Sequence, residues 1–282
     1  MRWSAGSRGN IEDRRGAGGV RGASMGVGGI VLVLALSWLT GTDLTSLIGV
    51  GGGPVEPGSS GGAVQSTPQE ERMVDFVDAV AADTQATWER ALGGRYQRTT
   101  VVLFRDAVES ACGFAQAATG PFYCPADRKV YLDLGFFDDL ARKLDAPGDF
   151  AQAYVIAHEF GHHVQNILGL NERAQSDRST GANSASVALE LQADCFAGVW
   201  GHDAMQTGRA AAGKVELEAG DVEEGLQAAS SIGDDRLQRM SKGRVSPESF
   251  THGSSAQRVE WFRRGMQAGD PGACDTFARL TQ

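Results

Sequence analysis

The chain of 282 residues contains a His-Glu-x-x-His string that constrains its fold more than any other feature. Positions i and i+4 of an α-helix lie on one face, so His158 and His162 can bind one metal ion while Glu159 lies beside it. Residues 150–157 contain no Pro or Gly, and apolar residues recur until Gly169 gives a stop signal. The sequence therefore predicts a buried helix of about 18 residues that carries a hydrolytic zinc site.

Between the two histidines lies Gly161, and a glycine costs about 1 kcal/mol relative to Ala in a helix interior. We therefore expect another element to pack close to the backbone at this position. The alternative interpretation of the string is a core helix with two buried histidines and an unrelated Glu. The spacing and the apolar surroundings favour the metal site.

A catalytic zinc site needs a third protein ligand, which usually comes from a separate element. Residues 186–200 form a strongly apolar segment in which Glu190 and Asp194 are again four positions apart. Two buried carboxylates without partners would be very costly, so they need a metal ion, a histidine or a base. We assign Glu190 as the third zinc ligand and expect Asp194 to accept the spare N–H of a ligating histidine. The alternative is a surface helix whose Glu and Asp face water.

The segments HEFGHHVQNILG, from His158, and ELQADCFAGVW, from Glu190, resemble a bacterial family of neutral zinc metallopeptidases. These are single-span membrane proteins with a gluzincin-type site. The resemblance covers nearly the whole chain apart from a Gly-rich stretch and includes residues 1–3, 10–15, 120–125, 233–238, 250–253 and 257–258. It implies that His158, His162 and Glu190 bind zinc and that Glu159 is the catalytic base, but it implies no particular substrate.

Charge is distributed unevenly along the chain. Residues 1–25 contain five Arg and two acidic residues, a net charge of +3, whereas the whole chain carries −9. The rest of the chain therefore carries about −12. A strongly acidic body argues against nucleic acid as a partner.

An apolar stretch follows the basic N-terminus. Residues 26–39 contain no charged residue, and apolar character returns at 44–50, although a full membrane span needs about 20 apolar residues. No clean cleavage site follows, so we favour an uncleaved signal anchor at 26–48 over a cleaved signal peptide. The expected single-pass topology in the cell membrane places residues 1–25 in the cytoplasm.

Residues 69–282 are predicted to form the peptidase domain on the extracytoplasmic side, after a Gly-, Pro- and Ser-rich linker at 49–68. A first helix is expected to end near Gly93, and strands are expected at 99–104 and 129–134. Strands precede the His-Glu-x-x-His helix and mostly helices follow it. This order predicts an α+β, zincin-like domain with a small sheet beside that helix and a mainly helical C-terminal half.

The second expected strand is a candidate for substrate binding. In zincin folds an edge strand binds an extended peptide through backbone hydrogen bonds, and we expect Val130 to Leu134 to have that role. The alternative is that this segment is an internal strand.

Four cysteines remain to be placed. Cys112 and Cys124 flank a short loop that a disulfide can close, whereas Cys195 and Cys274 lie far apart in sequence. An even number of cysteines in an extracytoplasmic domain favours two disulfides, 112–124 and 195–274. Zinc binding by the cysteines is disfavoured because the chain has no CxxC pair.

These residues predict a zinc-dependent endopeptidase that acts on a peptide or protein substrate. Zinc held by His158, His162 and Glu190 lowers the pKa of its water towards about 7. Glu159 accepts the proton as that water attacks the peptide carbonyl and then passes it to the leaving amine. The alternative is a non-catalytic, membrane-anchored scaffold that is stabilised by zinc.

Two other histidines have expected roles outside the set of metal ligands. His163 points about 100° away from His162 around the helix, so we expect it to be structural or, at most, to support a metal ligand from behind. His252 lies in a turn before a predicted helix, where loops often present functional groups to a cleft. We predict that His252 donates a hydrogen bond to the oxyanion, with a helix-capping or surface histidine as the alternative.

Overall fold

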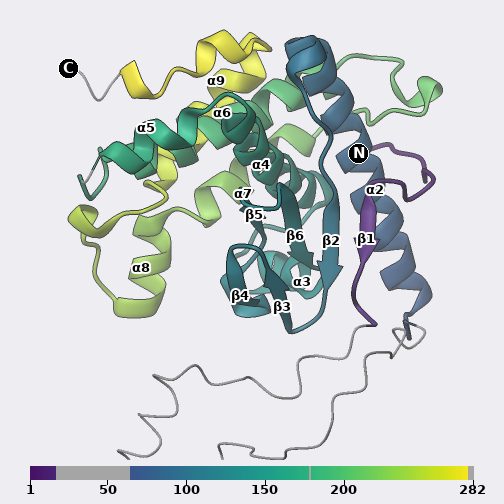
Figure 1. Cartoon of the computed structure of the whole chain (residues 1–282), viewed down its shortest axis with the longest axis horizontal. Helices are drawn as coiled ribbons and strands as arrows, with labels where there is room; N and C mark the ends of the chain where they lie inside the picture. Colours follow the sequence, from purple (N-terminus) through teal and green to yellow (C-terminus); the bar gives the residue numbers. More distant parts are fainter. Residues whose placement is uncertain (17–63, 178, 279–282) are drawn as a thin grey trace, which may run out of the picture.

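The computed structural model describes residues 1–16, 64–177 and 179–278. They form an α+β fold with a small mixed sheet and a mainly helical C-terminal half (Figure 1), as the sequence predicts. The strands are β1 (Ile11–Asp13), β2 (Val101–Phe104), β3 (Ala107–Ser110), β4 (Gly113–Gln116), β5 (Phe122–Cys124) and β6 (Lys129–Asp133). The α-helices are α2 (Pro68–Leu92), α3 (Gly135–Arg142), α4 (Asp149–Ile167), α5 (Leu170–Ser176), α6 (Ala185–Ala204), α7 (Asp221–Ser231), α8 (Asp234–Lys242) and α9 (Ser255–Ala268).

The long helix α2 begins and ends where its sequence signals lie. Thr67 caps it by accepting a hydrogen bond from the amide of Glu70, and Pro68 occupies the first turn, where no amide donor is needed. The chain leaves the helix at Gly93, whose φ of 56° lies in the region that favours glycine. The predicted first helix is therefore confirmed.

The four-stranded sheet has the order β1-β2-β6-β5. β2 runs parallel to β1 and β6, and β5 runs antiparallel to β6. Successive residues alternate between its faces. Leu103 and Leu132 pack into the main core with α2 and α4, whereas Phe104 and Tyr131 pack with Val108 of the β3–β4 hairpin.

The edge of the sheet nearest the metal-site helix is β5. The strand β6 is internal, because it pairs with β2 on one side and with β5 on the other. The prediction that Val130 to Leu134 forms a peptide-binding edge is therefore wrong. The three residues of β5 lie between Pro121 and Pro125, and a strand this short has too few positions to display a period of two.

Helix α4 packs against α6, and α6 packs against α9. A side chain added at Gly161 of α4 would place its Cβ 3.0 Å from the Cα and the carbonyl oxygen of Ala193 on α6. This confirms the close approach expected at Gly161. Ser184 caps α6, and a capping box formed by Ser254 and Gln257 begins α9.

Two disulfides join Cys112 to Cys124 and Cys195 to Cys274, so both predicted pairings are confirmed. The first links the turn of the β3–β4 hairpin to the end of β5. The second links α6 to the short 3₁₀ turn that follows α9.

The N-terminal residues belong to the same folded unit. β1 pairs with β2, the ring of Trp3 contacts Phe76 of α2, and Arg15 is buried. Residues 1–16 thus pack against the domain that was predicted to begin at residue 69, while the crossing expected at 26–48 lies outside the described residues. The fold therefore begins well before residue 69, and local patterns did not reveal this because the pairing of β1 with β2 joins segments far apart in sequence.

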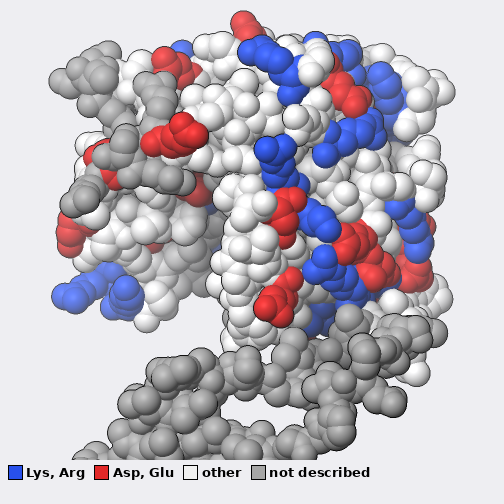
Figure 2. All heavy atoms as spheres, viewed as in Figure 1, with Lys and Arg blue, Asp and Glu red and all other residues white. Residues whose placement is uncertain are grey.

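Ion pairs fasten this N-terminal segment to α2. Arg8 pairs with Glu71 and Asp75, and Arg15 pairs with Asp13 and Glu71. Figure 2 shows basic and acidic side chains mixed with one another on the side of the molecule where β1 and α2 lie. Opposite charges therefore lie beside one another there, without a continuous patch of one sign in that view.

Among the described residues, no helix is long and apolar enough to cross a membrane. The predicted signal anchor at 26–48 and most of the predicted linker at 49–68 lie outside the described residues.

Candidate metal centre and active site

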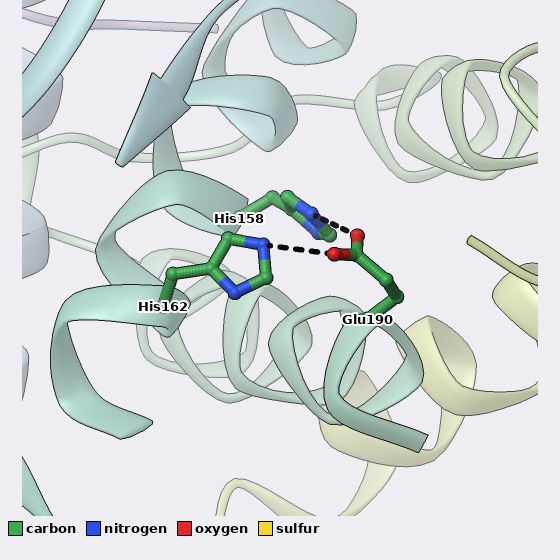
Figure 3. A group of neighbouring side chains, drawn as sticks. All are labelled: His158, His162 and Glu190. Carbon is green, nitrogen blue, oxygen red and sulfur yellow. Dashed lines mark ion pairs between the residues drawn. The ribbon is translucent and has the colours of Figure 1, made fainter. Parts of the chain in front are cut away.

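Two histidines of α4 and a glutamate of α6 converge between these helices (Figure 3). Nε2 of His158 lies 3.3 Å from Oε2 of Glu190, and Nε2 of His162 lies 3.6 Å from Oε1 of the same residue. The candidate ligand atoms all lie within 4.8 Å of one another, and one ion with bonds of about 2.0–2.2 Å can bridge the two separations of 3.3 and 3.6 Å. Two imidazoles and one carboxylate are the ligand set of many catalytic zinc sites, so the residues present fit zinc.

The electrostatics of this group favour a cation. Burial lowers the pKa of His158, but Asp194 and Glu190 outweigh this effect and raise it to about 9. Burial raises the pKa of Glu190, but the two histidines outweigh this effect and hold it well below its ordinary value. Glu190 is therefore an anion, as a carboxylate ligand must be.

Asp194 lies behind His158 and is fully buried. Its Oδ1 lies 2.8 Å from Nδ1 of His158, it accepts a hydrogen bond from the hydroxyl of Tyr154, and Arg258 donates to both of its oxygens at 2.8 and 2.9 Å. Because an ionised carboxylate only accepts hydrogen bonds, Nδ1 of His158 carries its proton. Nε2, which faces Glu190, is then the nitrogen that would give up its proton to a metal ion, and this is the orientation that a metal ligand needs.

Sequence reasoning gave no role to Tyr154 or Arg258. Arg258 is 3% exposed and lies one turn before Trp261 and Phe262 on the buried face of α9. The sequence did contain a signal for Arg258, because this charged residue occupies a position on the apolar face of the predicted C-terminal helix. A buried Arg needs a partner, so the position indicates an ion pair.

Glu159 lines a cleft of about 500 Å³ together with the three candidate ligands, His252 and Arg258. One part of the cleft wall is formed by β5 and the residues that flank it. Another part is apolar and contains Phe136, Leu144, Val155, Ile232 and Leu237. The cleft therefore offers backbone groups of a sheet edge and an apolar surface beside the candidate metal centre.

The loop before α9 brings His252 to this cleft. Oδ2 of Asp234 accepts hydrogen bonds of 2.7 Å from the amides of Thr251 and His252, and its Oδ1 lies 3.4 Å from Nδ1 of His252. The hydrogen bond with Asp234 raises the pKa of His252 although burial opposes it. The imidazole is 53% exposed, so a bound substrate can contact it.

His163 lies away from the metal group. Its Nε2 donates to the carbonyl oxygen of Gln97 at 2.6 Å, and its Nδ1 accepts from the hydroxyl of Tyr123 at 3.0 Å. The side chain is fully buried. It connects α4 to β5, in agreement with the structural role expected for it.

Comparison with known proteins identifies relatives along the whole chain. A family model described as "Putative neutral zinc metallopeptidase" matches residues 1–277. The uncharacterized protein YpfJ of Escherichia coli (strain K12) is 45% identical over 298 residues, which cover 99% of each chain. The uncharacterized protein Rv2575 of Mycobacterium tuberculosis is 45% identical over 206 residues, which cover 72% of this chain and 70% of the relative. No solved structure matches the chain.

Proposed function

Since the chain belongs to this neutral zinc metallopeptidase family, we propose that it is a zinc-dependent endopeptidase whose metal ion is held by His158, His162 and Glu190. One observation carries the proposal. Two imidazole Nε2 atoms and a carboxylate converge within 4.8 Å, and Glu159 lines the same cleft. A site that only stabilised the fold would need no base and would close its fourth coordination position with a protein ligand.

A bound zinc ion supplies a Lewis acid that polarises the peptide carbonyl and acidifies water. Glu159 accepts the proton of the attacking water and delivers it to the leaving amine. His252, held by Asp234, donates a hydrogen bond to the oxyanion, an interaction that typically contributes about 3–4 kcal/mol. Asp194 keeps His158 in the tautomer whose Nε2 is free.

The lining of the cleft supports cleavage within a chain. Arg258 is the only Lys or Arg among the described lining residues, and it is paired with Asp194. The lining carboxylates are Glu159 and Glu190, and both have roles in the proposed chemistry. His252, which also lines the cleft, has its own role in the proposed chemistry, so the described lining offers no further charge to hold a substrate terminus, as an exopeptidase site would. We propose that an extended peptide adds to the edge strand β5 through backbone hydrogen bonds.

We also propose that the peptidase domain works in an oxidising compartment outside the cytoplasm. Two disulfides support this placement, because disulfides persist mainly in oxidising environments.

The proposed activity can be tested by incubating the zinc-loaded full chain with a diverse peptide library and identifying the products by mass spectrometry. Glu159→Gln should keep its zinc and lose about 10²–10⁴-fold in kcat, because it removes the base and no ligand. Glu190→Gln should lose zinc as well as turnover. The exposed Glu109 of β3 provides the matched control, and Glu109→Gln should behave like the wild type.

The outcome also separates the two candidate functions. A wild-type chain that binds zinc at His158 and His162 but cleaves no peptide would favour the zinc-stabilised scaffold. An unchanged rate in Glu159→Gln would exclude this residue as the base.

A further inference from the structure

The second histidine of the metal group is held differently from the first. Nδ1 of His162 lies 2.9 Å from Oε1 of Gln165, one turn further along α4, whereas Nδ1 of His158 faces the carboxylate of Asp194. We propose that Gln165 is the positioning residue of His162, and that it fixes both the tautomer of this imidazole and its distance from Glu190. The inference rests on the proposed metal centre.

The orientation of the Gln165 amide follows from its partners. Its Nε2 donates to the backbone carbonyl of Leu189 at 2.6 Å, and a carbonyl oxygen can only accept a hydrogen bond. Oε1 of Gln165 must therefore be the atom that faces His162. Since Oε1 carries no proton, Nδ1 of His162 is the donor, and the lone pair of Nε2 remains free for a metal ion.

The same amide connects two ligands that come from different helices. His162 belongs to α4, while Leu189 directly precedes Glu190 on α6. A single side chain thus hydrogen-bonds to one ligand and to the backbone beside another. Gln165 is fully buried, so water does not replace either hydrogen bond if the side chain is removed, and the unpaired Nδ1–H and carbonyl would each carry a cost.

A second amide fixes the first. Nε2 of Gln165 also lies 3.2 Å from Oε1 of Gln192, and Nε2 of Gln192 donates to the carbonyl of Cys274 at 2.9 Å. Cys274 is held by its disulfide to Cys195, one turn after Gln192 on α6. The hydrogen-bonded chain from His162 therefore ends at a covalently restrained backbone carbonyl.

The chemistry of this position requires an amide. A Glu at 165 would accept from His162 but would have no proton for the carbonyl of Leu189, and its charge would be buried beside Glu190. A Leu at 165 would fill the space but would satisfy neither partner. Only Gln supplies an acceptor for the imidazole and a donor for the carbonyl at this reach.

The test measures zinc affinity of the full chain by competition with a chelator, independently of peptidase activity. Gln165→Leu should bind zinc about 10–100-fold more weakly than the wild type, as expected when the partner of a ligating histidine is lost. Gln192→Leu should lose less, because Gln165 keeps its bonds to His162 and Leu189. Gln152→Leu makes the same chemical change on α4 outside the metal group, and it should retain wild-type affinity.

A second measurement needs no variant. ¹⁵N chemical shifts of the imidazoles in the zinc-loaded wild type should show that His162 binds the ion through Nε2 and carries its proton on Nδ1. Zinc binding through Nδ1 of His162 would overturn the proposal, as would zinc affinity in folded Gln165→Leu within twofold of the wild type. A chain that binds zinc in this way but cleaves no peptide would refute the peptidase function and leave the role of Gln165 standing.

Discussion

The pair of Arg258 and Asp194 offers the sharpest test of how the metal centre is supported. Asp194 is fully buried and Arg258 is 3% exposed, so each side chain offsets the free-energy cost of burying the charge of the other. Arg258→Leu removes two of the hydrogen bonds to Asp194 and leaves its carboxylate with Tyr154 and His158. Breaking one side of a buried ion pair costs about 3–5 kcal/mol, because an uncompensated charge remains.

A double-mutant cycle separates this cost from simple loss of packing. Asp194→Asn alone leaves Arg258 unpaired and should also lose about 3–5 kcal/mol. The double variant buries no unpaired charge. Its loss of unfolding free energy should therefore be smaller than the sum of the two single losses, by a coupling free energy of about 2–3 kcal/mol.

The free energy of unfolding should be measured in urea after zinc has been removed with a chelator, because a ligand that binds only the folded state adds its own stabilisation. Losses that simply add in the double variant would refute the ionic coupling. So would a loss below about 1 kcal/mol in Arg258→Leu, since that value is typical of an exposed pair.

Two further predictions concern packing and pH. Gly161→Ala should gain about 1 kcal/mol of helix propensity but lose about 1–3 kcal/mol through overpacking, because the new Cβ would lie 3.0 Å from the backbone of Ala193. Calorimetry should therefore show a lower Tm, whereas Gly94→Ala, whose Cβ meets nothing within 4 Å, should not lower it; a Tm at or above wild type for Gly161→Ala would contradict the clash. Hydrogen bonds from Ser66 and two arginines lower the pKa of Glu71 from 4.5 to about 2, so its stabilising contribution is complete above about pH 4.5 and is lost as the pH falls towards 2. The difference in urea midpoint between wild type and Glu71→Gln should accordingly shrink from pH 7 to pH 3, and a constant difference would exclude this linkage.

The parts of the fold that the sequence predicts are those encoded by local patterns. The helix around His158 and Glu159 shows apolar periodicity and a stop signal. Glu190 and Asp194 stood out because two carboxylates in an apolar segment need partners. In both cases the pattern of apolar and charged residues lies within a segment of about 20 residues. Because the segment is buried, its charged side chains need a metal ion or a hydrogen-bonding partner.

The parts that escaped prediction depend on tertiary contacts. The strands β1 and β5 each contain three residues, and their assignment rests on pairing with β2 and β6 and not on their own sequence. Arg258 reaches Asp194 only because α9 crosses α6. Gln165 becomes significant only when the carbonyl of Leu189 lies beside it, and nothing in the local sequence distinguishes it from a surface Gln.

The geometry of the metal centre follows from how closely the helix backbones approach one another. Gly161 lies between the two histidines and allows α6 to contact α4 at Ala193, one turn beyond Glu190. On the other side of α6, Gly265 of α9 lies directly against the backbone of Cys195, which brings α9 close enough for Arg258 to reach Asp194. A Cβ at either glycine would separate the helices, and a hydrogen-bonded network whose contacts span only 2.6–3.2 Å tolerates little separation. The small residues therefore determine the distance between the ligands, and the charged and amide side chains determine which imidazole nitrogen faces the metal position.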